Sequence, residues 1–242
     1  AGSIEGAFIR GKFDVTDLIK PGQNNAIAVL VRKNDHIGVV KEPTTLYHDK
    51  NGGILGADNP TYHASIGWDW IPTIRGRNIG IWNDVFLNVS GAVTISDPFV
   101  LTDLPLPDTT TADIKIEVTL INNKAEPVTG ILAGKYGDIS FEEKVSMGPL
   151  ESKVAKLNPS THPELHFKNP KLWWPKGYGE PFLYDAELSF KTDDGSVSDK
   201  VAFKSGVREM AFNDDNMILN MYVNGRRFIG RGGNWGFPES NL

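Results

Sequence analysis

The stretch Ile114-Lys115-Ile116-Glu117-Val118-Thr119-Leu120 alternates apolar side chains with charged or polar ones. Because successive side chains of a β-strand point to opposite faces, this pattern predicts a strand with one buried and one solvated face. The same alternation recurs further along the chain, at Tyr184, Ala186, Leu188 and Phe190. No window of about ten residues follows the 3.6-residue period of an amphipathic helix. The sequence therefore predicts an all-β protein.

Further signals of this kind fill residues 92–208. A strong hairpin signal, Asp193-Asp194-Gly195-Ser196, separates the last two strands predicted there. A region of about a hundred residues with seven or more short strands fits an immunoglobulin-like β-sandwich. The predicted strands are Val93–Leu101, Ile114–Asn122, Val128–Tyr136, Ile139–Met147, Ser152–Leu157, Leu165–Phe167, Phe182–Lys191 and Val197–Val207.

Two regions flank this predicted sandwich. Residues 1–91 contain a capped turn that ends at Pro21-Gly22 and a loop of about thirty residues, a length typical of functional or disordered loops. Residues 209–242 contain Asn224-Gly225 between two apolar runs, which predicts a tight hairpin followed by a Gly-rich turn. The strand-like runs of the first region are Ala7–Phe13, Asn25–Arg32 and Ile81–Val89.

Composition excludes several classes of function. The 242 residues carry a net charge of −5, and no basic run is longer than Arg226-Arg227, which argues against nucleic-acid binding. No apolar run reaches the ~18 residues of a membrane helix. The absence of cysteine excludes disulfides, thiolate metal sites and a cysteine nucleophile. His162 and His166 flank Pro163, which is poor spacing for zinc, so no metal or cofactor is predicted.

The stretch Gly67-Trp68-Asp69-Trp70 places one carboxylate between two indole rings. Flat aromatic faces suit the apolar C–H faces of a sugar ring, and a fixed carboxylate accepts charge-assisted hydrogen bonds from hydroxyl groups. This chemistry favours a carbohydrate site. An alternative stays open, in which Trp68 and Trp70 pack a domain interface and Asp69 caps a turn.

A set of phrases, taken in order, resembles glycoside hydrolase family 2. The phrases are Gly11–Thr16 with Lys20-Pro21-Gly22, Gly80-Ile81-Trp82, Leu172-Trp173-Trp174-Pro175, Gly206-Val207-Arg208 and Arg231-Gly232-Gly233-Asn234-Trp235. The resemblance implies a partial jelly-roll (galactose-binding-like) sandwich over residues 1–91 and an immunoglobulin-like β-sandwich over residues 92–208. It further implies a hairpin and the first strand of a (β/α)8 catalytic barrel over residues 209–242.

Within the family, Gly67-Trp68-Asp69-Trp70 and Gly233-Asn234-Trp235 look like the exo-β-mannosidase and exo-β-glucosaminidase branch. The resemblance implies that Trp68 and Asp69 wall the subsite for the terminal sugar, and that Asn234 and Trp235 line the same pocket. For both pairs, simple packing remains the alternative.

The same resemblance suggests roles for three residues near the end of the predicted sandwich. Because adjacent strand residues face opposite ways, one of Trp173 and Trp174 should be core and the other should cover a domain interface. Arg208 is expected to form an ion pair that joins the sandwich to the barrel.

The resemblance also implies a retaining mechanism, which needs two carboxyl groups about 5–5.5 Å apart. No glutamate of this chain matches the family's two catalytic motifs, so we expect a chain truncated at both ends, inactive alone, that scaffolds a catalytic barrel and shapes its pocket. A stand-alone carbohydrate-binding module is the alternative.

The expected partners are a terminal β-linked sugar and the catalytic barrel of the same parent chain, with neither nucleic acid nor membrane among them. Unpaired sheet edges would favour self-association. Family analogy points to a periplasmic or extracellular location, but no segment of the sequence fixes the compartment.

Overall fold

The computed structural model describes residues 1–6, 9–32, 80–81, 83–214 and 217–233. The chain divides into two compact units, one formed by Leu87–Arg231 and the other by Ala1–Phe86 with Gly232–Leu242. No helix among the described residues is long and apolar enough to cross a membrane.

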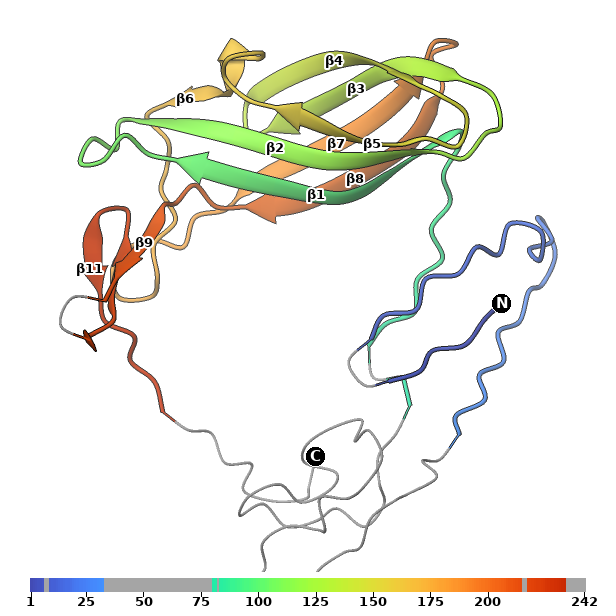
Figure 1. Ribbon diagram of the computed structural model, residues 1–242, viewed down its shortest axis with the longest axis horizontal. Coiled ribbons are helices and arrows are strands. Elements are labelled where there is room, and N and C mark those ends of the chain that lie inside the picture. The colour runs from blue at the N-terminus through green and yellow to red at the C-terminus, as the bar shows by residue number, and fades with distance from the viewer. Residues whose placement is uncertain (7–8, 33–79, 82, 215–216, 234–242) are drawn as a thin grey trace, which may run out of the picture. The chain divides into compact units, whose positions relative to one another are not determined.

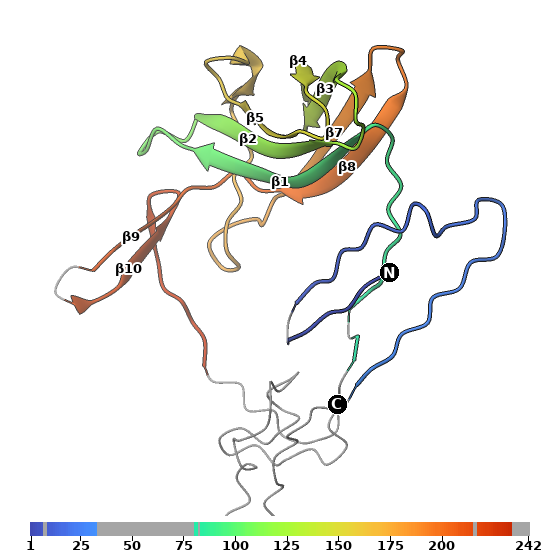
Figure 2. The ribbon, with the colours of Figure 1, turned by 45° about the vertical axis from the view of Figure 1, so that its right-hand side comes forward.

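Eight antiparallel strands of the Leu87–Arg231 unit form two stacked sheets (Figures 1 and 2). One sheet has the order β1-β2-β5, and β6 pairs with the first residues of β2. The other sheet has the order β4-β3-β7-β8. The eight strands predicted over residues 92–208 are all confirmed, three of them with identical bounds. The strands are β1 (Val93–Asp103), β2 (Thr111–Asn122), β3 (Val128–Tyr136), β4 (Ile139–Met147), β5 (Ser152–Leu157), β6 (His166–Lys168), β7 (Tyr184–Thr192) and β8 (Val197–Ser205).

The core lies between the two sheets, and the apolar side chains of the alternating segments fill it. Along β2 every second side chain is buried and its neighbours are partly exposed. On β7 the apolar positions likewise point inward. The inward side chains of both sheets therefore meet in one cluster. Its largest fully buried members are Tyr136, Phe190, Ile114, Ile116, Leu120, Leu132, Leu157, Leu165 and Leu188.

Side chains rather than a backbone ladder join the two sheets along the β1 and β8 edges. The Ser198 hydroxyl, which is buried, donates to the Val93 carbonyl at 2.8 Å and accepts from the Val93 amide at 2.7 Å. One residue further, the Asp199 carboxylate accepts from the Ile95 amide at 2.8 Å. These contacts satisfy backbone groups of β1 that an open edge would leave unpaired.

Tyr136 gives the sandwich a dependence on alkaline pH. Its ring is fully buried and its hydroxyl donates to the Ser205 carbonyl at 3.3 Å. Burial, which disfavours the phenolate, raises the pKa of Tyr136 to about 12. In the unfolded chain the same phenol has a pKa of about 10. The unfolded state thus releases this proton first as the pH rises.

Below about pH 10 the phenol is protonated in both states, so its ionisation leaves the free energy of unfolding unchanged. As the pH approaches 12, we expect the free energy of unfolding to fall by about 2–3 kcal/mol. Urea unfolding followed by circular dichroism at a series of pH values measures this loss. Because Tyr136→Phe removes this titrating group, it should make the alkaline loss of stability clearly smaller. An equal alkaline loss in Tyr136→Phe would contradict the assignment.

A third, smaller sheet follows the sandwich within the same unit. It has the order β11-β10-β9, built from β9 (Met210–Asn213), β10 (Asn220–Val223) and β11 (Arg226–Phe228). The hairpin predicted at Asn224-Gly225 is confirmed, since both residues have positive φ, +49° and +76°, as a two-residue turn of this kind requires. Strand β9 was not predicted.

Two expectations need correction. A (β/α)8 barrel has parallel strands, whereas β9, β10 and β11 pair antiparallel, so the described part of residues 209–242 contains no barrel strand. In the first unit the turn at Asp14–Gly22 is confirmed, with the Leu18 and Ile19 amides donating to the Val15 carbonyl. However, the described residues of the three strand-like runs form no ladder. Their apolar side chains, such as Ile27 and Leu30, lack the covered sheet face that stabilises a strand.

Candidate functional site

The residues predicted to bind sugar lie outside the described part of the structure. Trp68 and Asp69 belong to residues 33–79, and Asn234 and Trp235 belong to residues 234–242. Their arrangement stays a prediction. The described residues instead bring together a different group, at the junction between the sandwich and the β9–β11 sheet. We refer to it as the junction, and its central residues are Thr102, Leu104, Trp173, Arg208, Glu209 and Asn224.

The tip of the β10–β11 hairpin forms the centre of the junction. Asn224 is only 4% exposed. Its side-chain oxygen accepts from the Glu209 amide at 2.8 Å, and its side-chain nitrogen donates to the Trp173 carbonyl at 3.0 Å. Its own amide donates to the Glu209 carbonyl at 2.8 Å. Asn224 therefore uses both ends of its side-chain amide to join three separate segments of chain.

The end of β1 holds the other side of the junction. The Glu209 carboxylate accepts from the Leu104 amide at 2.8 Å. The Thr102 hydroxyl donates to the Arg208 carbonyl and accepts from the Arg208 amide. Residues 208 and 209 are thus attached to the sandwich both by backbone groups and by a carboxylate. Hydrogen bonds to a charged group are the stronger kind, at about 1.5–3 kcal/mol each.

Two tryptophans and two arginines complete the junction, in a way that differs from the prediction. Neither Trp173 nor Trp174 is core, since both are half-buried. The Arg208 guanidinium lies over the Trp173 ring, 4.5 Å from its centre, and the Arg226 guanidinium lies 4.9 Å from the centre of Trp174. Arg208 therefore makes a cation–π contact where an ion pair was expected.

The segment that follows these tryptophans also contacts the small sheet. The Tyr178 ring packs against Phe228, with 5.3 Å between ring centres, and its hydroxyl accepts from the Ile229 amide at 2.9 Å. A side chain at Gly179 would lie 2.7 Å from Trp174 ring atoms, so only glycine allows this close approach. Because Arg226 and Gly179 both pack against Trp174, that ring is not an open platform for a sugar.

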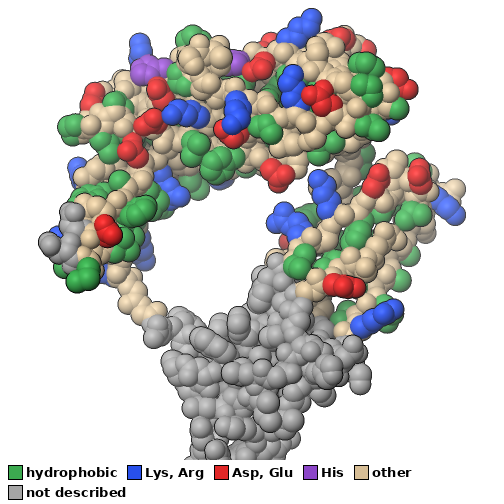
Figure 3. All heavy atoms as spheres, in the orientation of Figure 1, with side chains coloured by type: hydrophobic (Ala, Val, Ile, Leu, Met, Phe, Trp, Pro, Cys, Tyr) green, Lys and Arg blue, Asp and Glu red, His purple; other side chains and the backbone are tan. Residues whose placement is uncertain are grey.

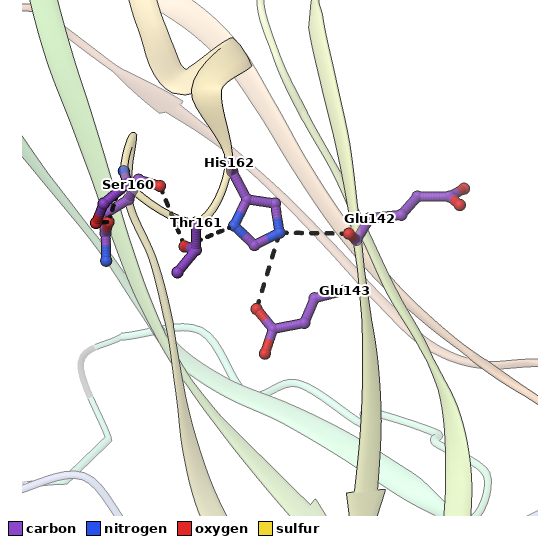
Figure 4. A network of polar contacts seen from close by, with 6 residues as sticks. Glu142, Glu143, Ser160, Thr161 and His162 are labelled. Atoms are coloured by element: carbon purple, nitrogen blue, oxygen red, sulfur yellow. Dashed lines mark hydrogen bonds and ion pairs between the residues drawn. The ribbon is translucent and has the colours of Figure 1, made fainter.

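A second polar cluster lies at the edge of the sandwich, where His162 precedes the 3-10 turn η2 (Pro163–Leu165) (Figure 4). The His162 ring is 8% exposed. One ring nitrogen is 3.0 Å from the Thr161 hydroxyl, and the other is 3.3 Å from the Glu142 carbonyl and 3.9 Å from the Glu143 carboxylate. Both nitrogens are engaged by the protein, so the ring has no free position for a substrate, and we assign it a packing role.

The outer surface of the sandwich carries mixed charge. In Figure 3 basic and acidic side chains alternate over the visible face. Several form exposed pairs, such as Lys200 with Glu187 at 2.8 Å and Lys204 with Asp185 at 2.6 Å. Among the residues described, no three acidic or histidine side chains are placed to hold a metal ion. The face seen in Figure 3 therefore mixes both signs of charge and is not a uniformly basic surface.

The fold and the junction define an all-β module, a sandwich joined by hydrogen bonds to a small sheet that follows it. Comparison with known proteins identifies the family of the sandwich. Residues 93–208, which form it, match the family model "Glycosyl hydrolases family 2". The sandwich therefore belongs to glycosyl hydrolase family 2, the family that the sequence resembles.

Two curated relatives match nearly the whole chain. An exo-beta-D-glucosaminidase of Streptomyces avermitilis is 30% identical over 98% of this chain and 24% of its own length. A mannosylglycoprotein endo-beta-mannosidase of Lilium longiflorum is 31% identical over 96% of this chain and 24% of its own length. The chain therefore spans about a quarter of the length of these relatives.

Solved structures give the same result for the fold. The exo-chitosanase CsxA of Amycolatopsis orientalis superposes with a TM-score of 0.54 at 26% identity, over 61% of this chain and 17% of that chain. A structure that describes the inhibition of the exo-beta-D-glucosaminidase CsxA gives a TM-score of 0.60 at 27% identity, over 66% of this chain and 18% of that chain.

Proposed function

We propose that this chain is the non-catalytic scaffold of a retaining exo-β-glycosidase that hydrolyses O-glycosidic bonds. In this role it holds a catalytic domain in place and contributes side chains to the mouth of the sugar pocket. The similarity to the exo-beta-D-glucosaminidase of Streptomyces avermitilis over 98% of the chain carries the proposal. That similarity extends beyond the sandwich to the region of Trp68 and Asp69.

The junction supports the scaffolding part of the proposal. A scaffold must transmit its own rigidity to the segment that follows it. Here Asn224, Glu209 and Thr102 attach the β9–β11 sheet to the sandwich by hydrogen bonds to backbone groups. Such contacts fix orientation better than apolar packing does, because hydrogen bonds are directional. A segment continuing from β11 therefore starts from a defined position.

The proposed substrate is a terminal β-linked sugar, with β-glucosamine and β-mannose as the first candidates because of the relatives' names. A panel of aryl β-glycosides tested on the full-length parent protein identifies the sugar. The 242-residue chain by itself is expected to release no more aryl group than a buffer blank. Hydrolysis by the purified chain would refute its non-catalytic role.

Asp69 carries the pocket-shaping part of the proposal. Loss of a charge-assisted hydrogen bond to a sugar hydroxyl costs about 1.5–3 kcal/mol. We therefore expect Asp69→Ala in the full-length parent to lower kcat/KM by about ten- to a hundredfold. Steady-state kinetics on the preferred aryl glycoside measures this change.

Asp185→Ala is the matched control for this experiment. Asp185 is an exposed aspartate of β7 that pairs with Lys204 on the outer face of the sandwich. Its removal should leave kcat/KM unchanged, because exposed ion pairs contribute little. If Asp69→Ala also leaves kcat/KM unchanged while the parent remains active, Asp69 has only a structural role.

The alternative is a stand-alone carbohydrate-binding module. No observation on the described residues favours it, since the Trp174 ring is covered by Arg226 and Gly179. Isothermal titration of the 242-residue chain with the preferred sugar separates the two proposals. Binding without the rest of the parent would support the module.

A further inference from the structure

The hairpin tip at the junction contains a chemically labile dipeptide. An asparagine followed by glycine is prone to deamidation, because glycine has no Cβ to hinder attack by its own amide nitrogen. Asn224-Gly225 is such a pair. It lies at the tip of the β10–β11 hairpin, where Asn224 is only 4% exposed. A labile pair in a position this important to the junction requires protection.

The contacts of Asn224 supply that protection. In deamidation the Gly225 nitrogen attacks the side-chain carbonyl carbon of Asn224, loses its proton, and expels the side-chain nitrogen as ammonia. Any rotation of the Asn224 side chain toward that nitrogen breaks the hydrogen bonds from the Glu209 amide, at 2.8 Å, and to the Trp173 carbonyl, at 3.0 Å. The closed junction therefore restrains the amide against the movement that the reaction needs.

The product cannot restore the junction. Water opens the cyclic imide to aspartate or isoaspartate, so the side-chain nitrogen that donated to Trp173 is replaced by an oxygen. A carboxylate oxygen would then face the Trp173 carbonyl oxygen in a buried position, where two acceptors repel and an unpaired charge is costly. Isoaspartate also adds a carbon to the backbone of a two-residue turn whose geometry is fixed.

We propose that Asn224 is a latent deamidation site which the closed junction protects, and that its conversion irreversibly releases the β9–β11 sheet from the sandwich. Each opening of the junction exposes the pair to reaction. The rate of conversion should thus report the fraction of time that the junction is open, as other local openings control chemical access to buried groups.

The test compares deamidation rates at Asn224 under mildly alkaline conditions, measured by tryptic digestion and mass spectrometry. Three samples are used: the folded 242-residue chain, the same chain in urea, and a synthetic peptide of residues 219–228. Fragmentation assigns the change to Asn224 within the tryptic peptide of residues 209–226. The other Asn-Gly pair, Asn51-Gly52, lies outside the described residues and falls in a different tryptic peptide.

We expect the folded chain to react at least about tenfold more slowly than the peptide, as for a site that is closed for most of the time. In urea the two rates should agree. Equal rates in the folded chain and in the peptide would overturn the proposal. This result does not depend on glycosidase activity, so it stands or falls separately from the proposed function.

A pair of variants ties the protection to the junction. Glu209→Ala removes the carboxylate that accepts from the Leu104 amide, and it should raise the deamidation rate of Asn224 toward that of the peptide. Glu187→Ala makes the same change in an exposed ion pair on the sandwich. It should leave the deamidation rate equal to that of the unsubstituted 242-residue chain. If Glu209→Ala does not fold, the comparison of folded chain and peptide still decides. A folded Glu209→Ala chain that reacts no faster would contradict control by the junction.

Discussion

Gly130→Ala is expected to lower the free energy of unfolding of the sandwich by about 3 kcal/mol or more. Gly130 lies in β3, where it pairs with Thr192 of β7 on one side and Val145 of β4 on the other. A Cβ at this position would overlap the Lys191 carbonyl oxygen and would lie 2.7 Å from a Phe190 ring carbon. The oxygen belongs to the backbone and cannot swing aside. Accommodating the methyl group therefore requires two central strands to separate, and overpacking that shifts the backbone costs about 1–3 kcal/mol, occasionally more.

Urea unfolding followed by circular dichroism measures this loss. Gly148→Ala is the matched control, because a Cβ there would meet only the Glu151 carboxylate, at an ordinary contact distance of 3.5 Å. We expect it to change stability by less than about 0.5 kcal/mol. Equal stabilities of the Gly130→Ala and Gly148→Ala variants would show that the close approach of β3 and β7 does not limit the fold.

Asn224→Asp is expected to detach the β9–β11 sheet while leaving the sandwich folded. The substitution keeps the shape of the side chain but replaces the donor to the Trp173 carbonyl with a charged acceptor. Removing one partner and leaving buried groups unsatisfied costs about 1–3 kcal/mol, and more where a charge is buried. A loss of about 2–4 kcal/mol should exceed the stability of a three-stranded sheet with few other contacts to the core.

Hydrogen exchange resolved by mass spectrometry tests this expectation. Amides of β10 should lose protection, whereas those of β2, in the centre of the sandwich, should keep it. Asn169→Asp is a close control, because Asn169 has the same positive φ of +49° and is exposed. Its conversion adds the same charge without burying it, so protection in the small sheet should be retained. Retained protection of β10 in Asn224→Asp would mean that the hairpin tip does not hold the junction.

Much of the sandwich follows from local sequence. The alternation around Ile116 and Leu188 places apolar side chains on one face of the strand, whatever its position in the sheet. Such a strand can therefore be predicted without knowing which strand it pairs with. The Asp193–Ser196 and Asn224-Gly225 turns could be predicted for the same reason, because residues with positive φ favour Asn and Gly. Strand β9 escaped prediction because Met210-Ala211-Phe212 shows too short an alternation to be distinguished from a loop.

The junction could not be predicted from local patterns. The sequence signalled a turn at Asn224 but not its burial, and it suggested an ion pair for Arg208 where the structure has a stacked Trp173. Both outcomes depend on segments far apart in the chain. Leu104, Trp173 and Asn224 come together only because the β1–β2 loop, the β6–β7 connection and the last hairpin meet at one end of the sandwich.

The amino-acid sequence by itself thus determined the all-β class, the order and approximate positions of the sandwich strands, and the resemblance to glycosyl hydrolase family 2. These properties depend on the periodicity of apolar side chains and on turns of a few residues, both of which act through local backbone geometry. Tertiary structure alone decided which polar side chains are enclosed and what they contact at the junction. Burial is a property of neighbours brought together by folding, and the free energy of a hydrogen bond depends on whether water can reach it.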